Sequence, residues 1–192
     1  MTTPNKFLIE GIDRLGKNEL LDGIQHRCGY HLTIHYQKPI KLTYYSNKDS
    51  ETSERQYQEA SFRTMFQLLR GEQETRIIFN RAHIGECVYA PVYRKYSGDY
   101  VFEIEREFKA DELPRTRLIL LTEDFSVSRH FIDDGKSLGG PADIKRRGKE
   151  QDLFLAAFDR SIIKDKKIIC VTNRSTGAFM PRDWILTEAL AT

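Results

Sequence analysis

The sequence predicts an α/β protein in which a parallel sheet of about five strands is covered by helices on both faces. Short apolar segments alternate with segments of helical periodicity along the whole chain. The apolar segments are nearly continuous, which is typical of strands buried on both sides. The chain has 192 residues, enough for one full core, and we expect a single domain over residues 1–192.

The first third of the chain predicts two strands and one helix. Phe7–Glu10 is an apolar run, and Lys17–Cys28 has the apolar spacing of a helix that stops at Gly29. Tyr30–Tyr36 is rich in β-branched and aromatic residues, as strands are, and a proline follows soon after it. The polar segment Ser46–Ser53 predicts an exposed loop.

The middle of the chain continues the alternation. Glu54–Leu69 carries an apolar face and predicts a helix, and Arg76–Phe79 predicts the third strand. Two helical patches, Val88–Tyr93 and Val101–Phe108, precede a fourth apolar strand at Arg117–Thr122.

The last third predicts a lid, two helices and a strand. The glycine-rich, charged segment 133–148 predicts a flexible lid over about 131–149, because glycines flank a basic cluster. A helix at Glu150–Ile162, a fifth strand at Lys167–Val171 and a helix at Pro181–Leu190 follow, the last with proline in its first turn.

Composition and charge argue against several classes of protein. The formal net charge of +2 does not by itself argue for binding to nucleic acid or to an anionic membrane. No apolar run approaches the ~20 residues of a membrane-spanning helix, and the N-terminus lacks the core of a signal peptide. Three cysteines without a C-x-x-C pair indicate a reducing compartment, and so we expect a cytoplasmic protein, in the host cytoplasm if it is viral.

The most informative segment is the turn between the first strand and its helix. Gly11, Gly16 and Lys17 have the spacing G-x-x-x-x-G-K, directly after an apolar strand and before a helical pattern. In such a loop the backbone N–H groups surround a phosphate and the lysine reaches the outer phosphates. The expected nucleotide-binding residues are Gly11, Ile12, Asp13, Arg14, Leu15, Gly16, Lys17, Asn18 and Glu19.

Asn18 stands where this pattern usually has Ser or Thr, whose hydroxyl binds Mg²⁺. An asparagine carbonyl is also a hard oxygen ligand, and this favours a variant loop in which Asn18 binds the metal. The alternative is a loop that has lost its metal and binds nucleotide poorly.

Two motifs carry a resemblance to a known family. E-G-I-D-R-L-G-K-N at 10–18 and N-R-A-H-I-G-E at 80–86 resemble the thymidylate kinase branch of the P-loop nucleoside monophosphate kinases, including the bacteriophage-type deoxynucleotide kinases. The resemblance covers residues 7 to about 162. It implies the three-layer P-loop NTPase fold, ATP as phosphoryl donor and Mg²⁺ as cofactor.

The resemblance also implies roles for individual residues. Lys17 would hold the donor, Asp13 would orient the acceptor or a metal-bound water, and Arg81 would hold the acceptor's phosphate. Arg146 and Arg147 of the lid would neutralise charge in the transition state. The expected substrate-binding residues are Arg14, Phe62 and Arg63 (with Phe62 as platform for the nucleobase), Asn80, Arg81 and Glu86.

Three departures from the family pattern leave alternatives open. Lys38 replaces an acidic residue, Asn80 replaces aspartate, and Asn18 replaces a hydroxyl. The first interpretation is a kinase of deoxynucleoside monophosphates, with a nucleotide as partner and a homodimer as a possible assembly. The second is a kinase of hydroxymethylated pyrimidines within DNA, and the third is a nucleotide-binding or structural protein without catalysis.

Overall fold

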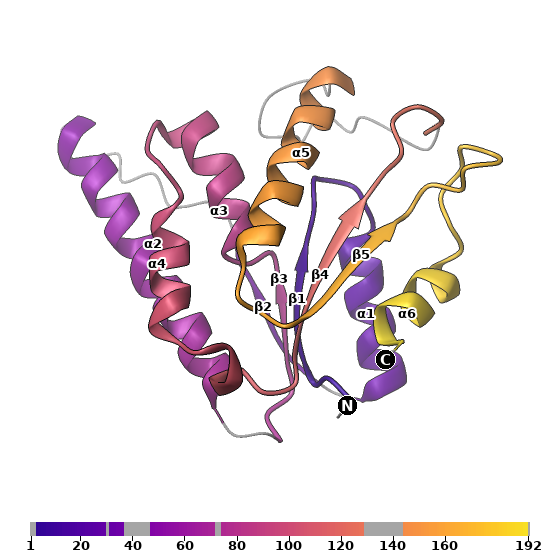
Figure 1. Cartoon of the computed structure of the whole chain (residues 1–192), viewed down its shortest axis with the longest axis horizontal. Helices are drawn as coiled ribbons and strands as arrows, with labels where there is room; N and C mark the ends of the chain where they lie inside the picture. Colours follow the sequence, from indigo (N-terminus) through magenta and orange to yellow (C-terminus); the bar gives the residue numbers. More distant parts are fainter. Residues whose placement is uncertain (1–2, 30, 37–46, 72–73, 129–143, 192) are drawn as a thin grey trace.

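The computed structural model describes residues 3–29, 31–36, 47–71, 74–128 and 144–191, and of residues 47–53 the backbone alone. Five strands form one parallel sheet in the order β2-β3-β1-β4-β5 (Figure 1). The strands are β1 (Lys6–Glu10), β2 (Leu32–His35), β3 (Ile77–Asn80), β4 (Thr116–Thr122) and β5 (Asp165–Cys170).

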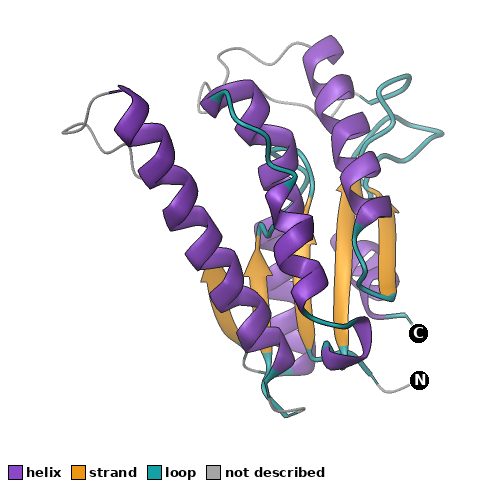
Figure 2. Ribbon diagram, turned by 60° about the vertical axis from the view of Figure 1, so that its left-hand side comes forward, coloured by secondary structure: helices purple, strands orange, loops and turns teal. Residues whose placement is uncertain are grey.

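Helices cover both faces of this sheet, as Figures 1 and 2 show. Helices α1 and α6 pack together on one face, and α2, α3, α4 and α5 lie on the other. The helices are α1 (Lys17–Cys28), α2 (Asn47–Arg70), α3 (Ile84–Tyr89), α4 (Tyr100–Glu107), α5 (Ile144–Arg160) and α6 (Arg182–Leu190), with a π-helical turn η1 (Ala90–Arg94) and a 3₁₀ turn η2 (Ala110–Glu112). The fold class predicted from the sequence is therefore confirmed.

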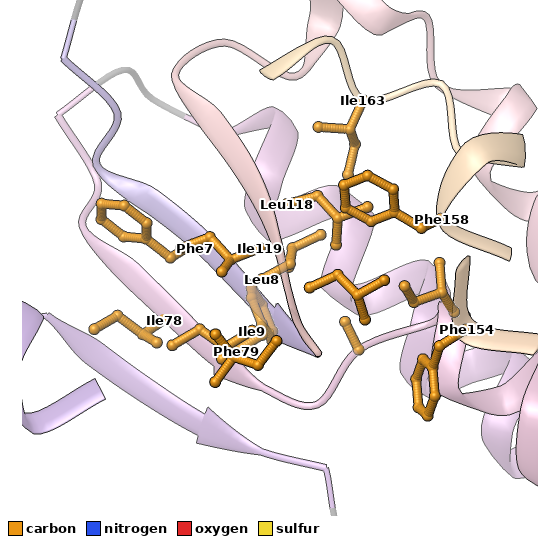
Figure 3. Packing of buried hydrophobic residues seen from close by; sticks show 14 of the residues in the cluster. Phe7, Leu8, Ile9, Ile78, Phe79, Leu118, Ile119, Phe154, Phe158 and Ile163 are labelled. Carbon is orange, nitrogen blue, oxygen red and sulfur yellow. The ribbon is translucent and has the colours of Figure 1, made fainter. Parts of the chain in front are cut away.

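The core lies around the three inner strands, β3, β1 and β4, in which every residue is buried. Apolar side chains of β1, β3 and β4 pack against each other and against Phe154 and Phe158 of α5 (Figure 3). Near-continuous apolar strands are buried here because helices cover both sides of the sheet. The core thus holds β1 rigidly, and with it the start of the glycine loop.

Two buried cations attach helix ends to the central strands. Lys6 donates from Nζ to the carbonyl oxygens of Leu69 (2.8 Å) and Gly71 (2.9 Å) at the end of α2. Arg117 bonds the carbonyl oxygen of Ala189 in the same way near the end of α6. The last carbonyls of a helix lack partners within the helix and carry partial negative charge, so a buried cation satisfies both needs.

Two predicted boundaries were wrong. Residues 47–53, expected as part of an exposed loop, form the start of α2. This segment contains neither glycine nor proline, so nothing in it ends a helix. Helix α5 begins at Ile144 rather than Glu150, so the basic cluster at 145–149 is helical, while 131–143 of the expected lid lies outside the described residues.

Helix α1 has the predicted limits, and the other predicted elements are present with shifted limits. The patch Val88–Tyr93 is divided between α3 and the π-helical turn η1, and Pro181 precedes α6 instead of lying in its first turn. Within the described ranges, no helix is long and apolar enough to cross a membrane.

Candidate functional site

The glycine loop is closely packed at both of its glycines. Gly11 has a φ of +135°, and a Cβ atom there would lie 2.5 Å from the carbonyl oxygen of Leu121 in β4. Gly16 has a φ of +78°, and a Cβ atom there would lie 2.9 Å from the ring of Phe179. Both positions favour glycine for two reasons. The φ angle is positive at each, and a Cβ atom would lie too close to its neighbours.

Lys17 is folded into this loop. Its side chain is buried (the residue is 7% exposed), and its Nζ donates to the carbonyl oxygens of Gly11 (2.8 Å) and Ile12 (2.6 Å). Burial lowers the pKa of Lys17 from 10.5 to about 8, although the nearby carboxylate of Asp13 partly offsets this. Among the described residues, the hydrogen-bond acceptors of this ammonium group are therefore two neutral carbonyls.

The structure brings Asp13 of the loop together with Arg81, which directly follows β3. Nη2 of Arg81 lies 2.8 Å from Oδ1 of Asp13. Arg81 has a φ of +69°, and its backbone N–H donates to the carbonyl of Ile9 in β1 (2.9 Å). The strained left-handed conformation is held by this bond and directs the guanidinium to the loop.

Glu10 is a site residue that the prediction did not include. Its Oε1 accepts hydrogen bonds from the backbone N–H groups of Ala82 (2.8 Å) and Gly85 (3.0 Å). Burial raises the pKa of Glu10, and the bond from Gly85 and the neighbouring His83 oppose that rise. A charged residue ending an otherwise apolar strand was the signal available in the sequence. Glu10 positions the segment that carries Arg81.

Asn18 and Asn80 are in direct contact. Nδ2 of Asn80 donates to Oδ1 of Asn18 at 2.6 Å, and it also lies 3.1 Å from Nδ1 of His35 at the end of β2. His35 had not been singled out, because nothing in its sequence neighbourhood shows that β2 and β3 end side by side.

Arg147 of α5 is buried beside the glycine loop, where hydrogen bonds fix its guanidinium. Its Nε donates to Oε1 of Glu123 at the end of β4 (2.9 Å), its Nη2 bonds the same oxygen, and its Nη1 donates to the carbonyl of Asp13 (3.1 Å). One turn further along α5, the amide of Gln151 bonds both the N–H and the carbonyl of Glu123. These contacts explain why α5 starts six residues early. Glu123 was missed by the sequence prediction as well.

Arg146 and Glu150 belong to the same end of α5. Nε of Arg146 lies 3.7 Å from Oε1 of Glu150, which accepts a hydrogen bond from Tyr93 of η1 (3.2 Å). Burial raises the pKa of Glu150, and the negative charge of Asp13 adds to the rise. Tyr93 and Tyr89 have ring centroids 6.0 Å apart. An aromatic pair and a carboxyl group therefore lie within electrostatic range of the loop.

Three expected substrate-binding residues are engaged elsewhere. Phe62 is 2% exposed and stacks on Tyr36, with ring centroids 5.4 Å apart. Arg63 forms an ion pair with Glu107 of α4. Each of these two side chains is occupied by a partner within the fold. A nucleobase could stack on Phe62 only after Tyr36 had moved.

Glu86, the third of them, is buried and accepts hydrogen bonds from Arg94, Tyr96 (3.0 Å) and Tyr100 (2.9 Å). Burial raises the pKa of Glu86, and Arg94 opposes the rise. Arg14, by contrast, lies within the loop, half-buried and with a φ of +70°.

The residues at the loop fit an anion better than a protein-held metal ion. Asp13 is paired with Arg81, and Glu123 is paired with Arg147. In the described part of the chain, no group of three or more His, Cys, Asp or Glu side chains is placed to hold a metal. The oxygen of Asn18, the expected Mg²⁺ ligand, already accepts a short hydrogen bond. The described side chains do not fit a protein-held Mg²⁺ ion.

Comparisons with known proteins support the fold. No family model and no curated protein matches the chain. Among solved structures, thymidylate kinase from Candida albicans is similar over 96% of this chain and 88% of its own, with a TM-score of 0.57 and 16% identity. The YorR protein from Bacillus subtilis, solved in complex with phosphorylated GDP, is similar over 85% of this chain and 84% of its own, with a TM-score of 0.55 and 15% identity. This chain has the fold of the P-loop kinases.

Proposed function

We propose that this protein is a nucleotide kinase that transfers the γ-phosphoryl group of ATP to a deoxynucleoside monophosphate. One observation carries the proposal. A buried lysine lies inside a glycine loop, and Arg81, which follows the neighbouring strand β3, pairs with Asp13 of the same loop. Lys17 and Arg81 are thus within electrostatic range of each other at the carboxyl ends of the strands, where ligands bind in open parallel sheets.

The donor side is built from Lys17 and the loop. The two carbonyls that Lys17 now bonds are weaker partners than phosphate oxygens, so a polyphosphate would replace them. The close packing of Gly11 and Gly16 keeps the loop backbone in place. Once Lys17 has exchanged these carbonyls for phosphate oxygens, it would hold the transferring group on a loop backbone that stays in place, which is how fixed charges stabilise a phosphoryl-transfer transition state.

The acceptor side is built from Arg81, with Asp13 and Glu10 behind it. The guanidinium has five N–H donors, and Nη2 is the one that bonds Asp13 among the described residues, so its planar fork could bind an acceptor phosphate as well. A phosphate acceptor is already an anion and needs no general base. An alcohol acceptor would need one, and Asp13 is held in an ion pair. This favours the nucleoside monophosphate over a hydroxymethylated base in DNA.

A second candidate is nucleotide binding without catalysis. The amide contact between Asn18 and Asn80 favours it, because it occupies the two positions where the family pattern has a hydroxyl and a carboxylate. Both candidates require the same nucleotide at the loop, and they differ only in turnover.

The test is transfer of label from γ-labelled ATP. The protein would be incubated with Mg²⁺ and each deoxynucleoside monophosphate, and separately with a duplex containing hydroxymethyluracil. We expect labelled nucleoside diphosphate. Lys17→Ala should reduce the rate by about 100-fold or more, whereas Lys164→Ala, at an exposed position before β5, should not change it.

Each result separates the candidates. Label in the duplex would replace the acceptor that we propose. ATP binding without transfer to any acceptor would favour the second candidate. Full activity in Lys17→Ala would remove the loop from the mechanism.

A further inference from the structure

Three polar side chains form a short chain beside the phosphate loop. His35 and Asn80 are register partners in β2 and β3, so their side chains emerge next to each other at the carboxyl end of the sheet. Nδ2 of Asn80 lies 3.1 Å from Nδ1 of His35 and 2.6 Å from Oδ1 of Asn18. Asn18 is the second residue of α1 and is exposed. These three side chains thus link the carboxyl end of the sheet to the first turn of α1.

The hydrogen-bonding capacity of these groups sets the orientation of Asn18. The NH₂ group of Asn80 has two protons, and these serve the two acceptors, His35 Nδ1 and Asn18 Oδ1. An amide NH₂ group can only donate, so its contact with His35 uses Nδ1 of the ring as the acceptor. Asn18 therefore has its carbonyl committed to Asn80, and its own NH₂ is the end that a ligand in the loop would meet.

The charges around the loop agree with this orientation. Lys17 is buried there, and the pairs Arg81–Asp13 and Arg147–Glu123 each cancel one carboxylate with one guanidinium. The charge of Lys17 and the loop N–H groups favour an anion. A divalent cation at Asn18 would lie beside the NH₂ protons of Asn80, which repel it.

We propose that Asn18 binds a phosphate oxygen of the nucleotide through its side-chain NH₂ group, and that the nucleotide binds this loop without a metal ion held by the protein. This inference deepens the proposed function and rests on it, since it concerns the same site. Asn80 and His35 are positioning residues, because they act through Asn18.

The experiment is calorimetric titration with ATP, once in Mg²⁺ and once in EDTA. Wild-type affinity should differ by less than about threefold between the two conditions. Asn18→Ala should weaken binding in EDTA by about tenfold, the value of one hydrogen bond to a charged group. Asn80→Asp presents only acceptors, so Asn18 must turn its NH₂ inwards and its carbonyl outwards. That variant should bind ATP at least about tenfold more tightly in Mg²⁺ than in EDTA.

The two proposals can fail separately. A wild-type affinity that falls tenfold or more in EDTA would overturn this inference, and so would an Asn18→Ala protein that binds as tightly as wild type in EDTA. In either case phosphoryl transfer by the same protein would leave the proposed kinase in place. An absence of ATP binding in both conditions would overturn both proposals.

Discussion

The low pKa of Lys17 makes nucleotide binding depend on pH in a predictable direction. Burial lowers the pKa of this ammonium to about 8, with Asp13 raising it and Arg81 lowering it further. A nucleotide binds the protonated lysine more tightly, because its phosphates pair with the charge. Affinity should therefore be constant with respect to this group below pH 8 and should fall above it.

The magnitude follows from the fraction of protonated lysine. With a pKa of about 8, the free protein has lost about nine-tenths of the Lys17 charge at pH 9. The dissociation constant for ATP should therefore rise about tenfold between pH 7 and pH 9, or about 1.4 kcal/mol of binding free energy. Binding at pH 9 should take up about one proton, since the bound phosphates restore the ammonium.

Calorimetry measures both quantities. Titrations with ATP at constant ionic strength from pH 7 to pH 9.5 give the affinity, and paired buffers of different ionisation enthalpy give the proton uptake. Lys17→Arg is the matched control, because arginine stays charged throughout this range. Its affinity for ATP should not change with pH.

Two results would contradict this reasoning. Wild-type affinity that is constant from pH 7 to pH 9 would mean that Lys17 is not the group that binds phosphate, or that it is not buried in the free protein. An equal loss of affinity in Lys17→Arg would assign the pH dependence to another group.

Three further predictions concern folding and can be measured by urea denaturation. Gly11→Ala should lower the free energy of unfolding by about 2 kcal/mol or more, because its Cβ would meet a backbone carbonyl. Gly148→Ala, where a Cβ meets nothing within 4 Å, should raise the free energy of unfolding by about 0.5–1 kcal/mol. Equal effects of the two substitutions would contradict the packing of the loop. Arg147→Met should lower the free energy of unfolding by about 3–5 kcal/mol, because it leaves Glu123 charged and buried without its partner, and adding Glu123→Leu to the same protein should recover part of this loss. Strictly additive losses would show that the two side chains do not interact. Lys6→Met should cost about 1–3 kcal/mol by removing the cap of α2, and an unchanged unfolding midpoint would refute that role.

Local sequence patterns predicted most of the fold. The largely apolar strands Phe7–Glu10 and Arg117–Thr122 are inner strands of the sheet, because a strand covered on both faces buries apolar side chains on both sides. Helix α1 has the predicted limits, since a glycine precedes it and another follows it. The start of α5 was missed because its anchors, Arg147 and Gln151, bond to a residue that lies more than twenty positions away in the chain.

Only part of the arrangement of the candidate site could be expected from the sequence. Asp13, Arg81 and Lys17 follow strand ends, and parallel strands bring such residues to one edge, so their proximity could be expected. The contacts of Phe62 with Tyr36 and of Glu86 with Tyr100 could not be expected from sequence spacing, because they come from packing between separate elements.

The sequence by itself determined the alternation of strands and helices, the parallel sheet and the glycine loop, because these depend on periodicity and on short-range steric limits. Only the tertiary structure decided which charges cancel. It pairs Arg147 with Glu123 and Arg81 with Asp13, and it sets Asn80 between His35 and Asn18. The free energy of a charge or an amide depends on burial and on partners brought from distant parts of the chain, and neither can be read from neighbouring residues.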